Sequence, residues 1–459
     1  MRDFTSGSIA RQLISFSIPM LIGNLLQQMY SIADMIIVGR YIGGPALASV
    51  GVSMSILMFV LASLMGLTTG ASVVISQFYG ARQYQRLTDT VSVSILSLLG
   101  ISLILTVIGV SSAPLLLKLL NTGEEIFSQA QLYMRTIMAG VIFPVFYNMY
   151  TAYMRALGDS RRPLYFLIFS IFLNLGLNLF FVLVLDMGVV GVAIATVISQ
   201  GMAALLCFFY ARAKMPLLRV RRLIFDRELF RLILKYGTPA AFQLSLTSLA
   251  QLSITRLINS FGAAAMAGIT AASRIDQFAL MPVSNLSMAL STLVAQNMGA
   301  GLEDRARRGL RIGLLYMLVC AILVSALLLA YRHQFMSLFL SPADPNTPEI
   351  LRIGSEYLNI MVLFYFLFAF LFAFNGFFRG AGDAVIAMVF PVFSLAVRAL
   401  SAHGLVYLGG MGPHALAWSI PIGWFLSSGA SFVYYKKRLW AGKLAVKPQG
   451  DQKSVSPNS

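Results

Sequence analysis

Long apolar segments, separated by short polar gaps, run along the whole 459-residue chain. Several of them contain no charged residue over more than twenty positions, as in 163–185, 187–211 and 357–378. A helix needs roughly 20 mostly apolar residues to cross a bilayer, so the pattern predicts an all-α integral membrane protein. We expect twelve transmembrane helices, at 12–37, 45–78, 88–113, 126–154, 163–186, 189–211, 228–257, 264–297, 309–331, 354–378, 384–408 and 413–435.

The composition supports this prediction and excludes several other classes. Hydrophobic residue types make up 58% of the chain and charged types 11%, whereas soluble domains carry about 25% charged residues. An ordinary cytosolic enzyme, a disordered chain and a disulfide-rich secreted module are therefore excluded. The net charge of +17 does not indicate a nucleic-acid partner, because no basic stripe alternates with aromatic residues. Cys207 and Cys320 lie in apolar segments and are interpreted as small core residues.

The distribution of basic residues predicts how the chain crosses the membrane. Of the 34 Lys and Arg residues, 26 lie at the termini or toward alternate gaps between the predicted spans, and six lie toward the other gaps. The remaining two, Arg274 and Arg398, lie within spans. Cytoplasmic loops carry the excess of Lys and Arg, so we expect both termini to be cytoplasmic.

An internal repeat divides the chain into halves. Shifting the sequence by about 220 residues places Pro19 on Pro239 and Gln77–Ala81 (QFYGA) on Gln296–Ala300 (QNMGA). Each half has an even number of spans, so the two repeats are parallel and related by an axis along the membrane normal. Halves of this kind enclose a central cavity, which indicates transport.

The repeat and the charge pattern together predict four regions. We expect two pseudo-symmetric six-helix lobes, at 1–211 and 236–440. A basic cytoplasmic linker, 212–235, joins them, and a disordered cytoplasmic tail follows at 441–459.

Two carboxylates lie inside predicted spans and away from the first or last three residues of them, and an acid near the centre of a span costs about 2.5–3.5 kcal/mol. Asp34 and Asp276 are therefore candidate ion-coupling residues. For Asp34 the alternative is a charge near the outer interface, and for Asp276 it is a structural pair with Arg274 or Arg398.

Polar residues at helical spacing form one face in the first span and a matching face in the seventh. We interpret both faces as lining a substrate cavity, and the alternative is hydrogen bonding between helices. The cavity residues are Asn24, Gln27, Gln28 and Ser31 in the first span, and Gln243, Thr247 and Gln251 in the seventh.

Two related sequences, RALGD and RGAGD, follow inner helix ends. We interpret them as structural turns, in which glycine allows a tight bend and aspartate caps the next helix. Their residues are Arg155, Gly158 and Asp159 in the first half, and Arg379, Gly382 and Asp383 in the second. Pro19, which removes a backbone hydrogen bond from its helix, is a candidate hinge.

These motifs resemble those of the multidrug and toxic compound extrusion (MATE) family over roughly residues 10–440. Pro19 is followed fifteen residues later by Asp34, and the glycine-rich run from Gly188 to Thr196 and the sequence SRIDQF around Asp276 also resemble that family. The resemblance implies a bacterial, multi-pass antiporter of the cell membrane. It would export small cationic amphipathic compounds in exchange for inward H⁺ or Na⁺, by rocking of the two lobes, and it would not be an enzyme.

The resemblance also implies an ion site at Asp34, Asn174, Asn178 and Thr196. Many family members have aspartate at the position of Asn178, so this chain lacks one negative charge there. That departure favours H⁺ over Na⁺ at Asp34, or a site shared with Asp276. We expect no other cofactor, no bound metal besides that Na⁺, membrane lipid as a neighbour and a monomer.

Two further observations limit the alternatives. The chain has no GxxxxGK[ST] motif, so transport would be driven by an ion gradient rather than by ATP. A flippase for lipid-linked saccharides, of related two-lobed architecture, stays open because Arg274 and Arg398 are candidates for binding phosphate.

Overall fold

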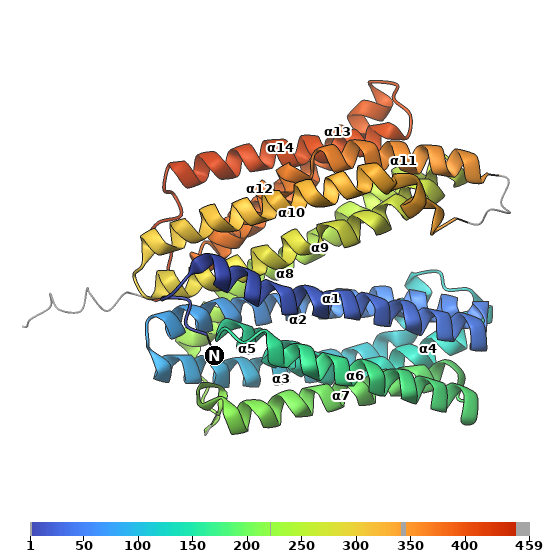
Figure 1. The fold of residues 1–459 in the computed structure, drawn as a ribbon. Helices are drawn as coiled ribbons and strands as arrows, with labels where there is room; N and C mark the ends of the chain where they lie inside the picture. The colour runs from blue at the N-terminus through green and yellow to red at the C-terminus, as the bar shows by residue number, and fades with distance from the viewer. Residues whose placement is uncertain (1, 221, 341–345, 447–459) are drawn as a thin grey trace, which may run out of the picture. The chain divides into compact units, whose positions relative to one another are not determined.

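The computed structural model describes residues 2–220, 222–340 and 346–446, and every regular element in these residues is a helix (Figure 1). Two five-residue π-helical turns, η1 and η2, and one 3₁₀ turn, η3, accompany the α-helices. The elements are α1 (Ile9–Ile37), η1 (Val38–Ile42), α2 (Gly44–Gly80), α3 (Tyr84–Leu119), α4 (Glu124–Ala139), α5 (Ile142–Ala156), α6 (Arg161–Leu179), η2 (Phe180–Val184), α7 (Gly188–Lys214), η3 (Pro216–Leu218), α8 (Arg227–Asn259), α9 (Ala263–Gly299), α10 (Glu303–Ser337), α11 (Thr347–Leu363), α12 (Tyr365–Gly380), α13 (Ala384–Tyr407) and α14 (His414–Lys436).

The number of helices that can cross a membrane is lower than predicted. Among the described residues nine helices are long and apolar enough, and eleven if each of two bent pairs is one span. The missing one is α8, which is 33 residues long but too polar. Its first turns carry Arg227, Glu228, Arg231 and Lys235, and its second half carries the expected cavity residues.

Two of the expected continuous spans, 126–154 and 354–378, are each broken into two helices. The axes of α4 and α5 differ by 46°, and those of α11 and α12 by 52°. In the first pair Pro144 lacks the N–H that would continue the helix back to Gly140. In the second pair Phe364, with φ −112° and ψ 9°, interrupts the helical backbone.

The chain forms two compact units whose boundaries differ from the expected lobes. The first unit contains the chain up to Asp3 and Ile18–Ala241, and the second contains Phe4–Ser17 and the chain from Phe242 onward. The expected linker, 212–235, therefore belongs to the first unit. The boundaries inside α1 and α8 lie within three residues of Pro19 and Pro239.

Helix α2 is attached to α4 and α5 in the first unit by side chains of serine. Helices gain little from apolar contact with one another inside lipid, so interhelical hydrogen bonds of this kind contribute to their association. Each hydroxyl lies within hydrogen-bonding distance of a carbonyl on the neighbouring helix: Ser49 of Ile126 (3.2 Å), Ser53 of Ala130 (3.3 Å), Ser72 of Ala152 (3.2 Å) and Ser76 of Ala156 (3.3 Å). The hydroxyls of Ser49, Ser53 and Ser76 share their proton with a carbonyl one turn back in α2 (3.0, 2.9 and 2.9 Å).

Two of these interhelical hydrogen bonds are buried, those of Ser53 and Ser76. Removing both hydroxyls is expected to weaken the first unit. The double variant Ser53→Ala and Ser76→Ala should lose roughly 1 kcal/mol of stability, since such bonds average about 0.6 kcal/mol each. Thermal denaturation in detergent measures the change. Ser55→Ala is the matched control, because Ser55 is exposed and donates only to Gly51 of its own helix. Equal stability of the double variant and this control would contradict the prediction.

The internal repeat appears at the ends of α2 and α9. Both helices have 37 residues, about 55 Å at the usual rise, so they exceed the roughly 30 Å apolar core of a bilayer. Both follow a glycine with positive φ, 115° at Gly43 and 89° at Gly262. Both end at the repeated motif, where the N–H after the helix donates to the carbonyl of Gln77 (2.9 Å) or Gln296 (3.0 Å).

In the second unit the repeated motif at the end of α9 binds the N-terminal segment. The backbone N–H of Phe4 donates to Gln296 Oε1 (3.0 Å). The carbonyl of Phe4 accepts from Asn297 Nδ2 (3.1 Å) and Arg305 Nε (3.0 Å). Phe4 itself is fully buried, so this segment is part of the unit's core.

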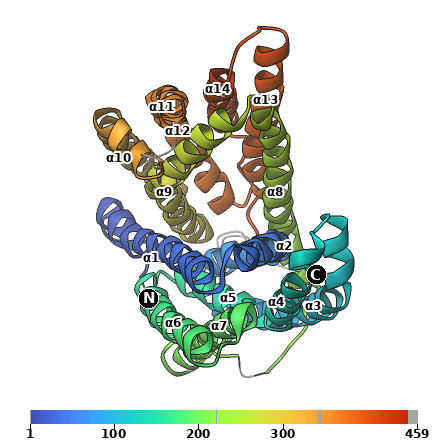
Figure 2. The same ribbon diagram turned by 90° about the vertical axis from the view of Figure 1, so that its right-hand side faces the viewer.

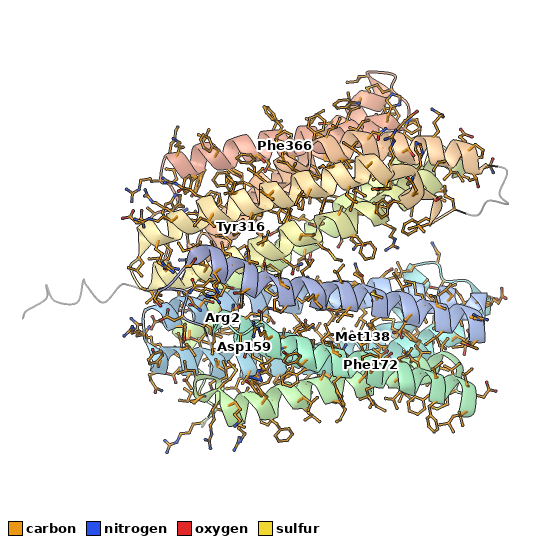
Figure 3. The ribbon with its side chains drawn as sticks, viewed as in Figure 1. Arg2, Met138, Asp159, Phe172, Tyr316 and Phe366 are labelled. Atoms are coloured by element: carbon orange, nitrogen blue, oxygen red, sulfur yellow. The ribbon has the colours of Figure 1, made fainter. Side chains whose placement is uncertain are left out.

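The two expected turns share a backbone conformation but use their aspartates differently. Gly158 and Gly382 both have positive φ, 81° and 90°. Asp159, labelled in Figure 3, caps α6 by accepting from the N–H groups of Arg161 (3.1 Å) and Arg162 (3.2 Å). Asp383 instead accepts from Tyr434 Oη (2.7 Å) and pairs with Lys443 (3.0 Å).

The arginines of these turns also differ in their surroundings. Arg379 donates to Asn375 Oδ1 (2.7 Å) on its own helix, α12. Arg155 is half-buried near the end of α5.

The chain after α14 is held against the second unit as far as Val446. Trp440 is 1% exposed and packs on the ring of Phe377, 4.8 Å between centroids. Hydrogen bonding to Tyr434 raises the pKa of Lys443, which keeps its ammonium charged beside Asp383. These contacts reach into the first residues, 441–446, of the tail that was expected to be disordered, and 447–459 lie outside the described residues.

Candidate functional site

A buried polar face of α6 forms the centre of the site in the first unit. Ser170, Asn174 and Asn178 follow one another at four-residue spacing, so they share one side of the helix. All three are at most 3% exposed, whereas Phe172, labelled in Figure 3, is 70% exposed on another side. Helix α6 lies beside α7 (Figure 2). Buried polar groups require hydrogen-bond partners, and these come from α7 and α1.

Asp34 of α1 joins this polar face. Asn178 Nδ2 donates to Asp34 Oδ1 (2.6 Å), 144 residues away in the chain, and to Asn174 Oδ1 (2.7 Å). The hydroxyl of Tyr30, one turn before Asp34, is hydrogen-bonded to Asp34 and to Thr196. The structure thus brings together all four residues to which the resemblance assigns an ion site.

Asn174 connects this cluster to α7. Its Nδ2 lies 3.2 Å from Ser199 Oγ and 3.4 Å from Thr196 Oγ1. In the opposite orientation of the amide, Nδ2 donates to Asp34 Oδ1 (3.1 Å) and Oδ1 accepts from Tyr30 Oη (3.2 Å), but the hydrogen bond from Asn178 Nδ2 is lost. In both orientations Asn174 joins α6 to α7.

The surroundings of Asp34 are neutral. Within the described parts of the chain, no Lys or Arg forms an ion pair with it inside 4 Å. A partly buried carboxylate without a basic partner is costly while charged, so it gains from binding a proton or another cation. Among the described residues Asn178 Oδ1 is buried without a hydrogen-bond partner. The cluster therefore contains carboxylate, amide and hydroxyl oxygens, which are the types of ligand that small hard cations take.

Two π-helical turns flank the cluster and were not predicted from the sequence. Segment η1 begins four residues after Asp34, η2 begins two residues after Asn178, and the two turns contact each other. Short π-helical segments are frequent at functional sites. Tyr30 and Ser199 were also missed, although Tyr30 lies one helical turn from Asp34 and the spacing alone could have indicated it.

Asp276 lies in the second unit and has a different environment. It is 7% exposed on α9 and accepts a short hydrogen bond from Tyr365 Oη of α12. In the described residues neither Arg274 nor Arg398 lies within 4 Å of its carboxylate in an ion pair, although Arg398 interacts with it electrostatically. Nε of Arg398 is buried without a hydrogen-bond partner.

The polar faces of α1 and α8 belong to different units, and their hydroxyls do not join helices. Ser31 Oγ donates to the carbonyl of Gln27 (3.1 Å), and Thr247 Oγ1 donates to that of Gln243 (2.8 Å). Each of these bonds lies within one helix, which weakens the interpretation as interhelical hydrogen bonding for both hydroxyls. Asn24, Gln27, Thr247 and Gln251 are exposed on their own units, and Gln28, Ser31 and Gln243 are half-buried.

The structure has several long apolar helices, and one of them carries a carboxylate, Asp34, that is hydrogen-bonded by neutral groups. This combination is typical of a membrane transporter. Comparison with known proteins gives the family. The MatE family model matches residues 19–180 and 239–402, so its two matches begin at the repeated prolines Pro19 and Pro239. The chain belongs to this family, the MATE multidrug efflux transporters.

Individual relatives and solved structures are similar over nearly the whole chain. "Probable multidrug resistance protein YpnP" of Bacillus subtilis is 30% identical over 439 residues, 95% of this chain and 97% of that protein. "Probable multidrug resistance protein NorM" of Thermotoga maritima is 26% identical over 405 residues, 84% and 83% of the two chains. The fold matches the outward-facing conformation of a multidrug resistance MATE family transporter with a TM-score of 0.89 and 23% identity, over 95% and 97% of the chains. These matches do not favour the flippase alternative.

Proposed function

We propose that the protein is a secondary active antiporter that exports cationic amphipathic compounds in exchange for inward H⁺, with Na⁺ as the second candidate ion. The observation that carries this proposal is the position of Asp34 among the neutral groups of Asn178, Asn174 and Tyr30, without a basic partner. In this environment a charged carboxylate carries a desolvation cost, and binding one cation removes that cost. The relatives named as multidrug resistance proteins support small organic molecules as the exported compounds.

The exchange works through the charge of Asp34. When Asp34 is charged it favours a cationic substrate, and when a proton neutralises it the substrate is released outward. Exchange of one H⁺ for one monovalent cation moves no net charge, so the pH difference drives it. Each unit of pH difference supplies about 1.4 kcal/mol and sustains about a tenfold gradient of the exported compound. One coupled ion is therefore enough for useful export.

The same proposal includes the topology and the movement. Both termini are cytoplasmic, the protein is a monomer in a bacterial cell membrane, and the two lobes rock around a central cavity. Pro19 is the hinge in α1. The unit boundaries inside α1 and α8 support this role, because they lie close to the repeated prolines Pro19 and Pro239.

Asp276 is proposed as a second ion-coupling residue. Its burial, its hydrogen bond from Tyr365 and the lack of an ion pair to it among the described residues support a carboxylate that changes its protonation state. Asp34 lies in the first unit and Asp276 in the second.

The choice between H⁺ and Na⁺ depends on Asn178. A single carboxylate suits a proton, whereas Na⁺ gains from a second negative ligand. Asn178→Asp restores that charge and is expected to raise the apparent affinity for Na⁺ by roughly tenfold, since 1.4 kcal/mol of added attraction corresponds to a factor of ten. Transport rates measured against Na⁺ concentration test this, with Asn148→Asp as the control because Asn148 bonds only within α5. No gain of Na⁺ dependence would contradict the assigned role of Asn178.

The proposed function is tested with purified protein in lipid vesicles and a fluorescent cation such as ethidium. A proton gradient and a sodium gradient are imposed separately. Ethidium movement driven by the proton gradient alone is the expected result. No movement under either gradient, with folded protein in the vesicles, would overturn the proposal.

A further inference from the structure

We propose that the first unit binds an anionic phospholipid through its headgroup phosphate, in a pocket formed where residues 215–220 and 222–226 pack on the helices. This site is separate from the ion site and does not depend on the proposed exchange. The pocket has a volume of about 280 Å³ and lies between α3, α5, α7 and the segment after α7. Its walls include Phe146, Tyr150 and Phe208, and two arginines, Arg212 and Arg219, line it as well.

The segment that closes the pocket is fixed in place. The backbone N–H of Ile224 donates to Ser92 Oγ (2.7 Å) on α3, and the carbonyls of Arg222 and Ile224 lie within reach of the same hydroxyl (3.3 and 3.2 Å). Met215 and Leu218 are each 2% exposed. The segment is therefore anchored at both ends, and the pocket is formed before any ligand binds.

The charge of the pocket specifies an anion. Arg212 and Arg219 are exposed, and in the described residues neither guanidinium group has a hydrogen-bond or ion-pair partner. No acidic residue lines the pocket. Guanidinium groups bind phosphate oxygens through paired hydrogen bonds. Two unpaired arginines also repel organic cations, so the pocket is not a second site for the exported compounds.

The other walls specify an amphipathic molecule. The remaining lining is apolar and aromatic, and Leu223 at its edge is 62% exposed. The volume is just below the 300–1,000 Å³ typical of sites that enclose a whole drug-sized ligand, so it fits a headgroup while the acyl chains stay in the bilayer. Basic pockets between transmembrane helices bind anionic lipid headgroups in this way. Free phosphate would leave the aromatic walls unused.

The test measures phospholipid retained by the purified full-length protein, using native mass spectrometry with added phosphatidylglycerol or phosphatidylcholine. We expect one tightly retained phosphatidylglycerol and no equivalent phosphatidylcholine. The double variant Arg212→Gln and Arg219→Gln should weaken retention at least about tenfold, since charge-assisted hydrogen bonds are the strong ones. The matched control is Arg227→Gln and Arg231→Gln, which removes the same charge from exposed positions of α8 outside the pocket.

A second variant keeps the proposal falsifiable if the double variant does not fold. Val220→Trp fills the pocket and retains both arginines, and it should also lose the lipid. Equal loss in the arginine double variant and its α8 control would show general attraction to anionic lipid and overturn the proposal. Displacement of phosphatidylglycerol by inorganic phosphate alone would identify a free-phosphate site and overturn it as well.

Discussion

Replacing Asp34 by asparagine is expected to abolish ion-driven export while the protein stays folded. The asparagine keeps the shape of the side chain and can still hydrogen-bond with Asn178 and Tyr30, but it cannot gain or lose a proton. The ethidium gradient of about tenfold that one unit of pH difference can sustain should therefore fall to about onefold. Ethidium accumulation in vesicles under an imposed proton gradient measures this change.

The control for Asp34→Asn is the same chemical change at an exposed position. Asp304 lies in the first turn of α10 and is exposed, so Asp304→Asn should export like the unmodified protein. Melting temperatures of both variants in detergent show whether they are folded. Undiminished, gradient-driven export by Asp34→Asn would remove Asp34 from the coupling mechanism.

The largest loss of stability is expected from a valine at Gly70. The Cβ of any residue at this position of α2 would lie 2.6 Å from Gly237 Cα and 2.7 Å from the carbonyl oxygen of Ile233. The first half of α8 would have to move away from α2, and overpacking of this kind costs about 1–3 kcal/mol or more. Thermal denaturation in detergent should show a clear fall in melting temperature.

Gly100→Val is the matched control for this prediction. It places the same side chain on α3, where a Cβ at Gly100 meets nothing within 4 Å. We expect Gly100→Val to melt close to the unmodified protein. If Gly70→Val melted at the same temperature as Gly100→Val, α2 would not approach the first half of α8 this closely.

The helices and the repeat could be predicted because they depend on local patterns. Hydropathy locates each apolar segment, and the repeat is visible in the prolines Pro19 and Pro239 and in the motifs that end α2 and α9. The break before α5 follows from Pro144, which the sequence shows directly. The break at Phe364 has no such signal, because its residue type is compatible with a helix.

The boundaries between the units could not be predicted from hydropathy. They fall inside α1 and α8, and an apolar pattern does not report which neighbours a helix packs against. The linker was expected to stand apart because it is basic, whereas the hydrogen bonds of Ser92 attach it to α3. The polar character of α8 is visible in the sequence, but a span at 228–257 was still expected there.

The ion site was only partly accessible from the sequence. The resemblance to a family indicated Asp34, Asn174, Asn178 and Thr196, which the structure places in one cluster. The sequence alone could not show that Asp34 and Asn178, which are 144 residues apart in the chain, are joined by a 2.6 Å hydrogen bond. It also gave no sign of η1 and η2, since π-helical turns depend on how neighbouring helices pack.

The central claim is that ion and substrate exchange in opposite directions, and one measurement tests it most directly. Vesicles that contain the protein and a trapped pH-sensitive dye receive ethidium on one side, in the absence of Na⁺ and of any proton gradient. The account predicts that the ethidium gradient drives protons the opposite way, with a matching pH change that disappears in Asp34→Asn. Ethidium crossing the membrane with no movement of protons, and with no movement of Na⁺ when Na⁺ is supplied, would contradict it.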